Sequence, residues 1–255
     1  MIDSHAHLFL CEGSDDELLA AAAAAGVERI LDVGLDEPTN EGVVAAAARH
    51  DVVFASVGRH PNDAEGFDDE AAAAIARLAA EEKVRAIGET GLDFYRDTAS
   101  PQAQRRAFAA QIEIAVELAL PIVIHARDAE GESAAVDEIF TTLDARAGDA
   151  TVVLHCFSAP LRVADAAERG WFCSFAGNVT YPRSEALREA AAQVPEERIL
   201  VETDAPFLAP QPLRGKRNQP ANVVETAKVV AAARGVSYEA LEATVAANAR
   251  SLFGW

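Results

Sequence analysis

The chain has 255 residues, of which 50% are hydrophobic and 25% are charged, and its formal net charge at pH 7 is −19. This length and apolar content allow a sizeable core. The negative charge excludes an affinity for nucleic acids or membranes that rests on overall charge alone. No apolar run reaches the length of a membrane span and no basic leader opens the chain, so we expect a cytoplasmic protein without a membrane partner.

Cysteine and lysine usage add two expectations about the environment. The cysteines are odd in number and lack CxxC spacing, which argues against a disulfide framework or a thiolate zinc site, so we expect reduced thiols. Lysine is rare among the 22 basic residues. An acidic, lysine-poor surface suits a protein that stays soluble in concentrated salt, which gives the hypothesis of a halophilic source. The residues concerned are Cys11, Cys156 and Cys173, and Lys83, Lys216 and Lys228.

The opening segment, MIDSHAHLFL at residues 1–10, places two histidines and an aspartate in an apolar run. Side chains alternate along an extended strand, so Asp3, His5 and His7 would share one face while apolar residues share the other. A single histidine on a strand is more often a hydrogen-bonded core residue than a ligand. Two histidines on one face make a metal site a real alternative.

Seven further runs rich in β-branched residues are expected as strands. They lie at residues 28–34, 51–58, 84–90, 120–127, 151–158, 170–177 and 198–204. Alanine-rich helical patterns occur between them, at 15–25, 40–50, 68–81, 101–119, 131–146 and 160–169. Regular alternation of strands and helices predicts a parallel sheet. Eight such units predict an α/β fold, a single (β/α)8 TIM barrel domain over residues 1–255, with a doubly wound open sheet as the alternative.

A proline-rich stretch follows the last predicted strand, DAPFLAPQPLRGKRNQP at residues 204–220. We expect a long loop over the barrel mouth, because active-site residues of such barrels come from the carboxyl ends of the strands. Its cations Arg214, Lys216 and Arg217 could gather a nucleic-acid strand locally, or could be an ordinary solvated surface.

Histidines and carboxylates recur at the ends of the predicted strands. Acidic residues near helix starts commonly cap them, but the carboxyl ends of all barrel strands converge on one mouth and would collect these side chains. Imidazole and carboxylate ligands together suit divalent ions such as zinc or manganese, and a shared carboxylate can bridge two of them. The set comprises His5, His7, His60, Glu89, Asp93, His125, His155, Glu202 and Asp204.

Seven separated motifs resemble those of the TatD-type metal-dependent deoxyribonucleases, a branch of the amidohydrolase-like barrels. The resemblance runs from residue 2 to NARSLFG near the C-terminus and covers essentially the whole chain. It departs at Asn62, where the family often has a second histidine, and at Gln219, where we expect glutamate. The motifs are DSHAHL, GRHP, GETGLDF, HAR, LHCF, ETDAP and RGKRN.

The resemblance implies a nuclease that hydrolyses DNA from an end with two divalent metal ions, Mg, Mn or Zn. We expect the protein to be a monomer. It implies that Asp204 also accepts the proton of the attacking water, a catalytic role beside its role as a ligand. The implied metal ligands are His5, His7 and Asp204 for one ion, His125 and His155 for the other, and Glu89 as the catalytic bridge between them.

Four other residues have expected supporting roles. His60 is assigned no metal and would contact the phosphate or the leaving oxygen. Arg127 is the candidate phosphate clamp, because its planar guanidinium suits that geometry. Glu202 would orient a metal-ligating side chain or contact substrate, or would form a plain salt bridge. Asp93 would support a metal ligand from outside or cap the turn after the strand.

Two other functions stay open at the sequence level. An amide, lactone or ester hydrolase could use the same barrel, but many such enzymes bridge their metals with a carbamylated lysine. Lys83 precedes the fourth strand and the other two lysines follow the eighth, which leaves Glu89 as the bridge. A metal-binding scaffold without catalysis is the third possibility, but it needs neither a candidate base nor phosphate-binding groups.

Overall fold

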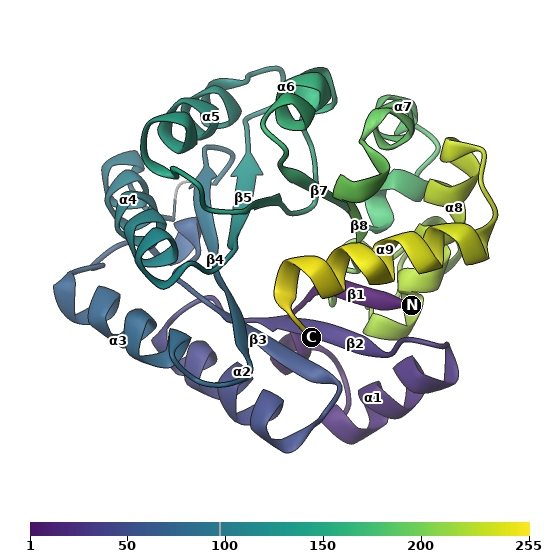
Figure 1. The fold of residues 1–255 in the computed structure, drawn as a ribbon, viewed down its shortest axis with the longest axis horizontal. Coiled ribbons are helices and arrows are strands. Elements are labelled where there is room, and N and C mark those ends of the chain that lie inside the picture. Colours follow the sequence, from purple (N-terminus) through teal and green to yellow (C-terminus); the bar gives the residue numbers. More distant parts are fainter. Residues whose placement is uncertain (97) are drawn as a thin grey trace. The chain divides into compact units, whose positions relative to one another are not determined.

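The computed structural model describes residues 1–96 and 98–255, in which eight strands alternate with helices (Figure 1). The strands are β1 (Ile2–Ala6), β2 (Arg29–Val33), β3 (Val53–Val57), β4 (Val84–Asp93), β5 (Ile122–Arg127), β6 (Val152–Leu154), β7 (Phe172–Phe175) and β8 (Ile199–Val201). The helices are α1 (Asp15–Ala24), α2 (Glu37–Arg49), α3 (Asp69–Ala79), α4 (Pro101–Leu118), α5 (Ala134–Arg146), α6 (Val163–Glu168), α7 (Glu185–Gln193), α8 (Val223–Arg234) and α9 (Tyr238–Phe253).

The expected strands are all present, and the six helical patterns given above form helices. The pattern at 160–169 forms a 3-10 turn, Pro160–Arg162, followed by α6. One strand differs in extent. β4 continues to Asp93, beyond the predicted end at residue 90, so Asp93 as well as Glu89 lies within this strand.

The chain forms two compact units. The first unit is Met1–Asp32 with His155–Trp255, and the second is Val33–Leu154. In the first, β1 pairs with β2 and β7 with β8; in the second, β3, β4, β5 and β6 pair in that order. All these pairs are parallel, so each connection must cross back over the sheet, and most do so through a helix.

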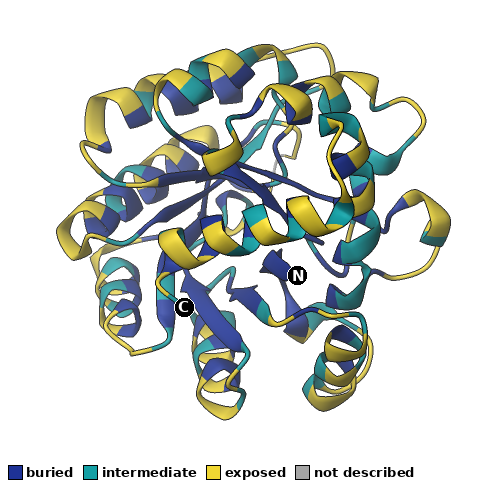
Figure 2. Ribbon diagram, turned by 45° about the vertical axis from the view of Figure 1, so that its right-hand side comes forward, coloured by how far each residue is buried: buried dark blue, intermediate teal, exposed yellow. Residues whose placement is uncertain are grey.

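The strands are buried and the helices are amphipathic (Figure 2). Helix α3, for example, buries Ile75 and Leu78 on one face and exposes charged residues on the other. Helix starts follow from local sequence: Ser14 and Glu17 form a capping box at α1, and Ser100 caps α4 directly before Pro101. Across the described residues, no helix combines the length and apolarity that a membrane span requires.

Candidate metal centre

In the first unit, backbone hydrogen bonds place the end of β1 against the segment that follows β8. Asp204 N–H donates to the His5 carbonyl at 2.9 Å, and His7 N–H donates to the Ala205 carbonyl at 2.8 Å. Ala6 and Ala205 form a parallel bridge between these two contacts. The two histidines of the opening motif and the aspartate of ETDAP are therefore neighbours because two strand ends run side by side.

Their side chains form a buried cluster. His5 Nε2 lies 3.3 Å from His7 Nε2, and Asp204 Oδ1 lies 3.9 Å and 3.6 Å from these two nitrogens. Burial tends to raise the pKa of Asp204, but the His7 hydrogen bond and the charges of His155, His5 and His7 outweigh it and lower this pKa. The cluster thus keeps an anionic oxygen among imidazoles, as a divalent cation requires.

His155 and Glu202 extend the same cluster. The His155 ring stacks on His5 with centroids 3.9 Å apart, and its Nδ1 lies 3.0 Å from Glu202 Oε1. Possible ligand atoms of His5, His155 and Glu202 all lie within 4.8 Å of one another. Glu202 Oε2 is buried and has no hydrogen-bond partner among the described residues. A buried carboxylate oxygen left open beside two imidazoles fits a bound cation.

The strand predicted at 198–204 is shorter than expected, which changes the reason why its two carboxylates lie near the histidines. The predicted strand at 198–204 would place Glu202 and Asp204 on one face, but β8 ends at Val201 and Asp204 has a left-handed φ of 53°. Strand alternation therefore does not apply beyond Val201. Both carboxylates still reach imidazoles of the first unit, Glu202 at His155 and Asp204 at His7, because the chain turns between them.

Asp3 has a role that the sequence did not indicate. It accepts hydrogen bonds from Thr203 Oγ1 at 2.6 Å and from Thr203 N–H at 2.9 Å. Burial raises the pKa of Asp3 to about 8. Asn218, of the RGKRN motif, donates from Nδ2 to the Thr203 carbonyl at 2.9 Å. Asp3 and Asn218 therefore hold the residue between Glu202 and Asp204 from both sides.

The second unit carries a second cluster on β4, β5 and the loop after β3. Glu89 Oε1 lies 2.6 Å from His125 Nδ1 and 3.5 Å from His60 Nε2. Possible ligand atoms of His60, Glu89 and His125 all lie within 4.8 Å of one another. His60, which we expected to contact only substrate, is thus a direct neighbour of a predicted ligand pair. Its Nδ1 accepts the backbone N–H of Asn62 at 3.0 Å, which fixes the ring.

Asp93 combines the two roles that the sequence left as alternatives. Its Oδ1 accepts the N–H groups of Tyr95 and Arg96, both at 3.0 Å, so it caps the turn after β4. Its Oδ2 lies 3.3 Å from His125 Nε2 and accepts Asn62 Nδ2 at 3.1 Å. Burial tends to raise the pKa of Asp93, but His125 and these donors outweigh it and hold the pKa below its usual range.

Buried amides of α4, which the sequence analysis missed, support this cluster. Gln104 Oε1 accepts the N–H of Asp93 at 2.8 Å. Gln111 Oε1 accepts the N–H of Arg59, the residue before His60, at 2.7 Å. Both glutamines are at most 1% exposed and lie seven residues apart on the helix. Uncharged amides at core positions of an amphipathic helix were the signal that would have identified them.

Arg127, the candidate phosphate clamp, ends β5 two residues after His125. Its guanidinium lies over the Tyr95 ring, 4.1 Å from the centroid. Within the described residues it makes no salt bridge, so stacking fixes the plane of the group and leaves its N–H edge for an anion.

The cations of the loop at 204–220 are largely engaged. The loop is present as expected, with 3-10 turns at Gln211–Leu213 and Pro220–Asn222. Arg214 lies over Tyr181, 4.3 Å from the ring centroid, while Lys216 is exposed. Arg217 donates to the Leu10 carbonyl at 2.8 Å and pairs with Glu12 at 3.7 Å.

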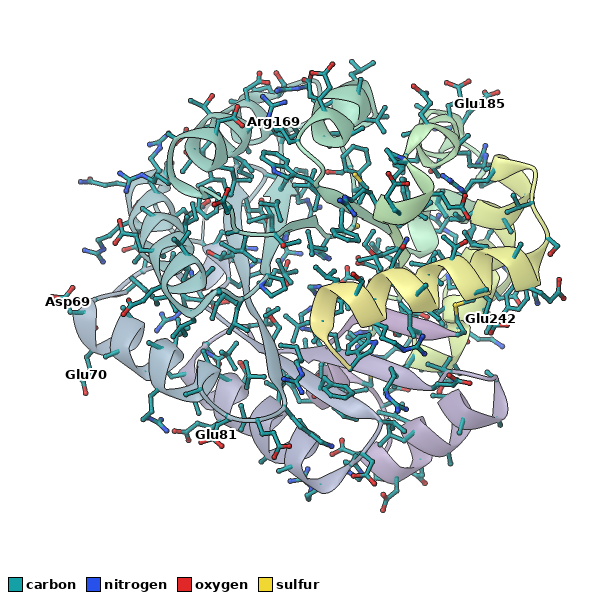
Figure 3. All side chains as sticks on the ribbon, in the orientation of Figure 1. Asp69, Glu70, Glu81, Arg169, Glu185 and Glu242 are labelled. Carbon is teal, nitrogen blue, oxygen red and sulfur yellow. The ribbon has the colours of Figure 1, made fainter. Side chains whose placement is uncertain are left out.

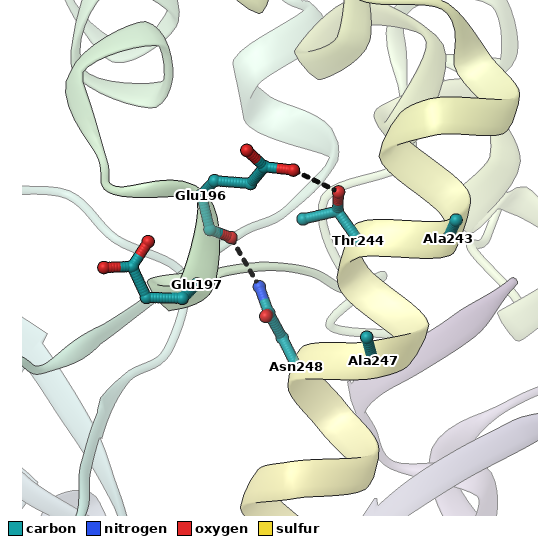
Figure 4. A pocket seen from close by; sticks show the side chains of 6 residues that line it. All are labelled: Glu196, Glu197, Ala243, Thr244, Ala247 and Asn248. Atoms are coloured by element: carbon teal, nitrogen blue, oxygen red, sulfur yellow. Dashed lines mark hydrogen bonds between the residues drawn. The ribbon is translucent and has the colours of Figure 1, made fainter.

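The lysines and one surface hollow lie outside these clusters. Lys83 precedes β4 and donates to the His50 carbonyl at 2.9 Å, and Lys228 pairs with Glu225 at 2.6 Å. The hollow is in the first unit, between α9 and the residues preceding β8 (Figure 4). There Asn248 donates to the Glu196 carbonyl at 2.8 Å and Thr244 to its carboxylate at 3.2 Å. These contacts dock α9, and the hollow lies at the opposite end of β8 from Asp204.

Comparisons with known proteins cover the whole chain. Residues 2–254 match the family described as TatD related DNase. The uncharacterized metal-dependent hydrolase YabD of Bacillus subtilis is 37% identical over 99% of this chain and 98% of its own length. The 3'-5' ssDNA/RNA exonuclease TatD of Cronobacter sakazakii is 39% identical over 93% of this chain and 91% of its own.

Comparison with solved structures points to the same family and fold. The TatD homologue YJJV of Escherichia coli superposes with a TM-score of 0.91 at 26% identity, covering 100% of this chain and 98% of that one. A 2,6-dihydroxybenzoate decarboxylase from Rhizobium, with a TM-score of 0.60 at 14% identity over 99% and 98%, shares the fold alone. With strands ordered β1 to β8 as in the chain, the predicted (β/α)8 barrel is confirmed. The chain belongs to the TatD-related DNase family of metal-dependent hydrolases.

Proposed function

We propose that this protein is a two-metal exonuclease that removes nucleotides from the 3' end of single-stranded DNA. The observation that carries the proposal is the pair of imidazole and carboxylate clusters at the carboxyl ends of strands, a buried one in the first unit and a partly buried one in the second. Arg127, stacked but not ion-paired within the described chain, supports a phosphate substrate. The name of the Cronobacter relative supports the choice of strand end.

The proposed centre joins the two clusters. In a (β/α)8 barrel the carboxyl ends of the strands open onto one mouth, which is the reason to assign both clusters to one site. We assign His5, His7 and Asp204 to one ion, His125 and His155 to the other, and Glu89 to both. When bound, such ions lower the pKa of a shared water and stabilise the attacking and leaving oxygens.

The side chains of the site would position the substrate and accept a proton from the attacking water. Asp204 is the proposed acceptor of the proton from the attacking water, because its carboxylate lies beside His5 and His7 on a backbone held by Thr203. Arg127 would grip the phosphate that carries the scissile bond. His60, which Asn62 orients, would face the leaving oxygen.

Glu202 and Asp93 are proposed to set which ring nitrogen the histidine next to each of them presents to a metal. Glu202 Oε1 lies at Nδ1 of His155, which leaves Nε2 for a metal. Asp93 Oδ2 lies at Nε2 of His125, which leaves Nδ1 for a metal, on the side of Glu89. Carboxylates that accept the second N–H of a ligating histidine fix its tautomer and its orientation.

Three coarser proposals complete the assignment. We propose that residues 1–255 act as one monomeric domain, supported by a family match that spans residues 2–254. We place it in the cytoplasm, supported by three free cysteines. The acidic exterior, which includes Asp69, Glu70 and Glu81 pointing outward in the second unit (Figure 3), supports adaptation to salt.

The deciding experiment combines chelation with a substrate panel. The purified protein is treated with EDTA, then supplied with magnesium, manganese or zinc, and given end-labelled single-stranded DNA, RNA, duplex DNA, a lactone and an amide. We expect chelation to abolish cleavage, metal to restore it, and single-stranded DNA to lose 3' nucleotides. Hydrolysis of the lactone or amide without cleavage of nucleic acid would establish the alternative hydrolase. Metal binding without turnover of any substrate would establish a scaffold.

A further inference from the structure

Two exposed phenylalanines flank His7 in the first unit. Phe9 lies in the 3-10 turn Leu8–Leu10 directly after β1, and Phe207 lies in the loop after β8. Their ring centroids are 6.0 Å and 6.3 Å from that of His7, with planes inclined by 75° and 70°. Neither ring stacks flat on the imidazole. With Phe9 39% and Phe207 50% exposed, aromatic surface faces solvent beside a proposed metal ligand.

The backbone that carries Phe207 is tightly held. Phe207 N–H donates to the Asp204 carbonyl at 2.8 Å, and the Phe207 carbonyl accepts Asn218 Nδ2 at 2.8 Å. Tyr181 Oη donates to the Ala209 carbonyl at 3.1 Å. The loop also runs directly against Gly177, where a Cβ atom would lie only 2.0 Å from the Leu208 carbonyl oxygen. The exposed ring of Phe207 therefore projects from a fixed support.

Phe9 has an equally fixed support. Leu8 N–H donates to Asp32 Oδ1 at 2.9 Å, and Leu10 N–H donates to the His7 carbonyl at 3.0 Å. The Leu10 carbonyl in turn accepts a hydrogen bond from Arg217 at 2.8 Å, which ties this turn to the loop of Phe207. Because the backbone that carries both rings is already fixed, a ligand that covers them orders little further backbone, so they are prepared for binding.

We propose that Phe9 and Phe207 form a stacking platform for the nucleobases next to the scissile phosphate. The inference rests on the proposed nuclease function and names the part of the substrate that these rings contact. Every base has a π face, so stacking on an aromatic side chain binds single strands with little sequence preference. The loop of Phe207 also carries Arg214 and Lys216, both exposed, whose charges complement a phosphate backbone.

Such a platform predicts a preference for single strands. Bases in a duplex are already stacked and paired, so their faces are not available to Phe9 and Phe207 until the end frays. A strand end with unpaired bases can place one base on a ring while its phosphate lies at the neighbouring metal centre. Duplex ends should therefore be poor substrates for reasons of base access and not of charge.

The test compares a natural oligonucleotide with one that is abasic at the two terminal positions. Phe9→Ala and Phe207→Ala are measured beside the wild type for Kd by fluorescence anisotropy, kcat/KM and bound metal. We expect each variant to lose about five- to a hundredfold in kcat/KM and in affinity on the natural strand, the range that stacking on one base provides. On the abasic strand the variants and the wild type should be equal, with metal content unchanged.

Two matched variants sharpen the result. Phe207→Tyr keeps the ring and should restore wild-type values. Val236→Ala removes a different exposed apolar side chain, 44% exposed between α8 and α9, and should change nothing. An equal loss on both strands, or a loss of metal, would show that the rings act through His7 and overturn the platform. A change of oligomeric state without discrimination between the strands would show self-association and overturn it too.

The outcome separates this inference from the nuclease assignment. If the wild type cleaves DNA but binds natural and abasic strands equally, the platform is wrong and the nuclease stands. If the wild type cleaves no nucleic acid, the nuclease proposal fails. The affinity measurement still judges the platform in that case, because Phe207→Ala must weaken binding of the natural strand alone.

Discussion

Glu202 Oε1 lies 3.0 Å from Nδ1 of His155, and the same oxygen accepts the backbone N–H of Cys156 at 2.8 Å. One carboxylate oxygen thus fixes both the ring and the backbone of the residue pair that follows β6. Asp93 acts on the other nitrogen of His125, at 3.3 Å from Nε2. The two histidines are thus oriented through opposite ring nitrogens, Nδ1 in His155 and Nε2 in His125.

This relationship predicts the behaviour of Glu202 variants. Glu202→Ala removes the acceptor of the His155 Nδ1 proton and should weaken metal binding about 10- to 100-fold, the usual effect of losing such a partner. Glu202→Gln keeps an acceptor oxygen and should lose less. Metal titration by isothermal calorimetry measures both. An affinity unchanged in Glu202→Ala would contradict the positioning role, and total loss of one ion in both variants would make Glu202 a ligand.

Glu89→Gln tests the proposed bridge. An amide carries no charge and offers one good acceptor, so it cannot hold two cations as a carboxylate does. We expect bound metal to fall and cleavage of single-stranded DNA to be nearly abolished, measured by elemental analysis and a labelled-strand assay. Full stoichiometry at the wild-type rate would mean that another group bridges the ions. Lys228→Gln, on a surface helix, is the matched control and should be unaffected.

The barrel was predictable because each strand and its neighbouring helix carry a clear local pattern. The extent of β4 was not, because the predicted strand at 84–90 stops short of Gly91 and Asp93. Gly91 instead pairs with His125 of β5, and a Cβ atom there would lie 2.0 Å from the His125 carbonyl oxygen. That glycine marks a close approach of two strands, which a single sequence does not distinguish from a turn.

The supporting residues of the clusters were harder to predict than the candidate ligands. Histidines at strand ends point to metal chemistry by residue type and position alone. Asp3, by contrast, lies in the same N-terminal segment as His5 and His7, yet it accepts hydrogen bonds from Thr203, two hundred residues away in the chain. Such a contact depends on where β8 ends and how the chain turns at Asp204, which no local pattern specifies.

Cys173 should report global unfolding. Burial raises the pKa of this thiol to about 12, and the residue is 1% exposed, so neither thiolate nor access is available in the folded protein at pH 8. We expect Cys173 not to react with a thiol reagent until denaturant unfolds the chain. Mass spectrometry of the peptide that contains Cys173 measures its labelling. Rapid labelling in native buffer would show that β7 opens locally.

Stability should rise with salt. With a net charge of −19, repulsion among carboxylates opposes the folded state, and added ions screen it. We expect the melting temperature, measured by circular dichroism, to be higher in molar potassium chloride than in dilute buffer. If residues 1–255 form one domain, the melting curve should show a single transition. A melting temperature that does not change would remove the support for salt adaptation. Two separate transitions would contradict the single domain.

Arg127→Ala separates substrate binding from metal binding. The guanidinium coordinates no cation, so both ions should stay bound, whereas the phosphate loses a charge-assisted contact worth about 1.5–3 kcal/mol, a fall in kcat/KM of about ten- to a hundredfold. Tyr95→Ala leaves the charge but removes the ring 4.1 Å beneath it, and should cause a smaller fall. Metal analysis and kinetics on both variants decide the matter. If Arg127→Ala loses an ion, or cleaves single-stranded DNA at the normal rate, Arg127 is not the clamp.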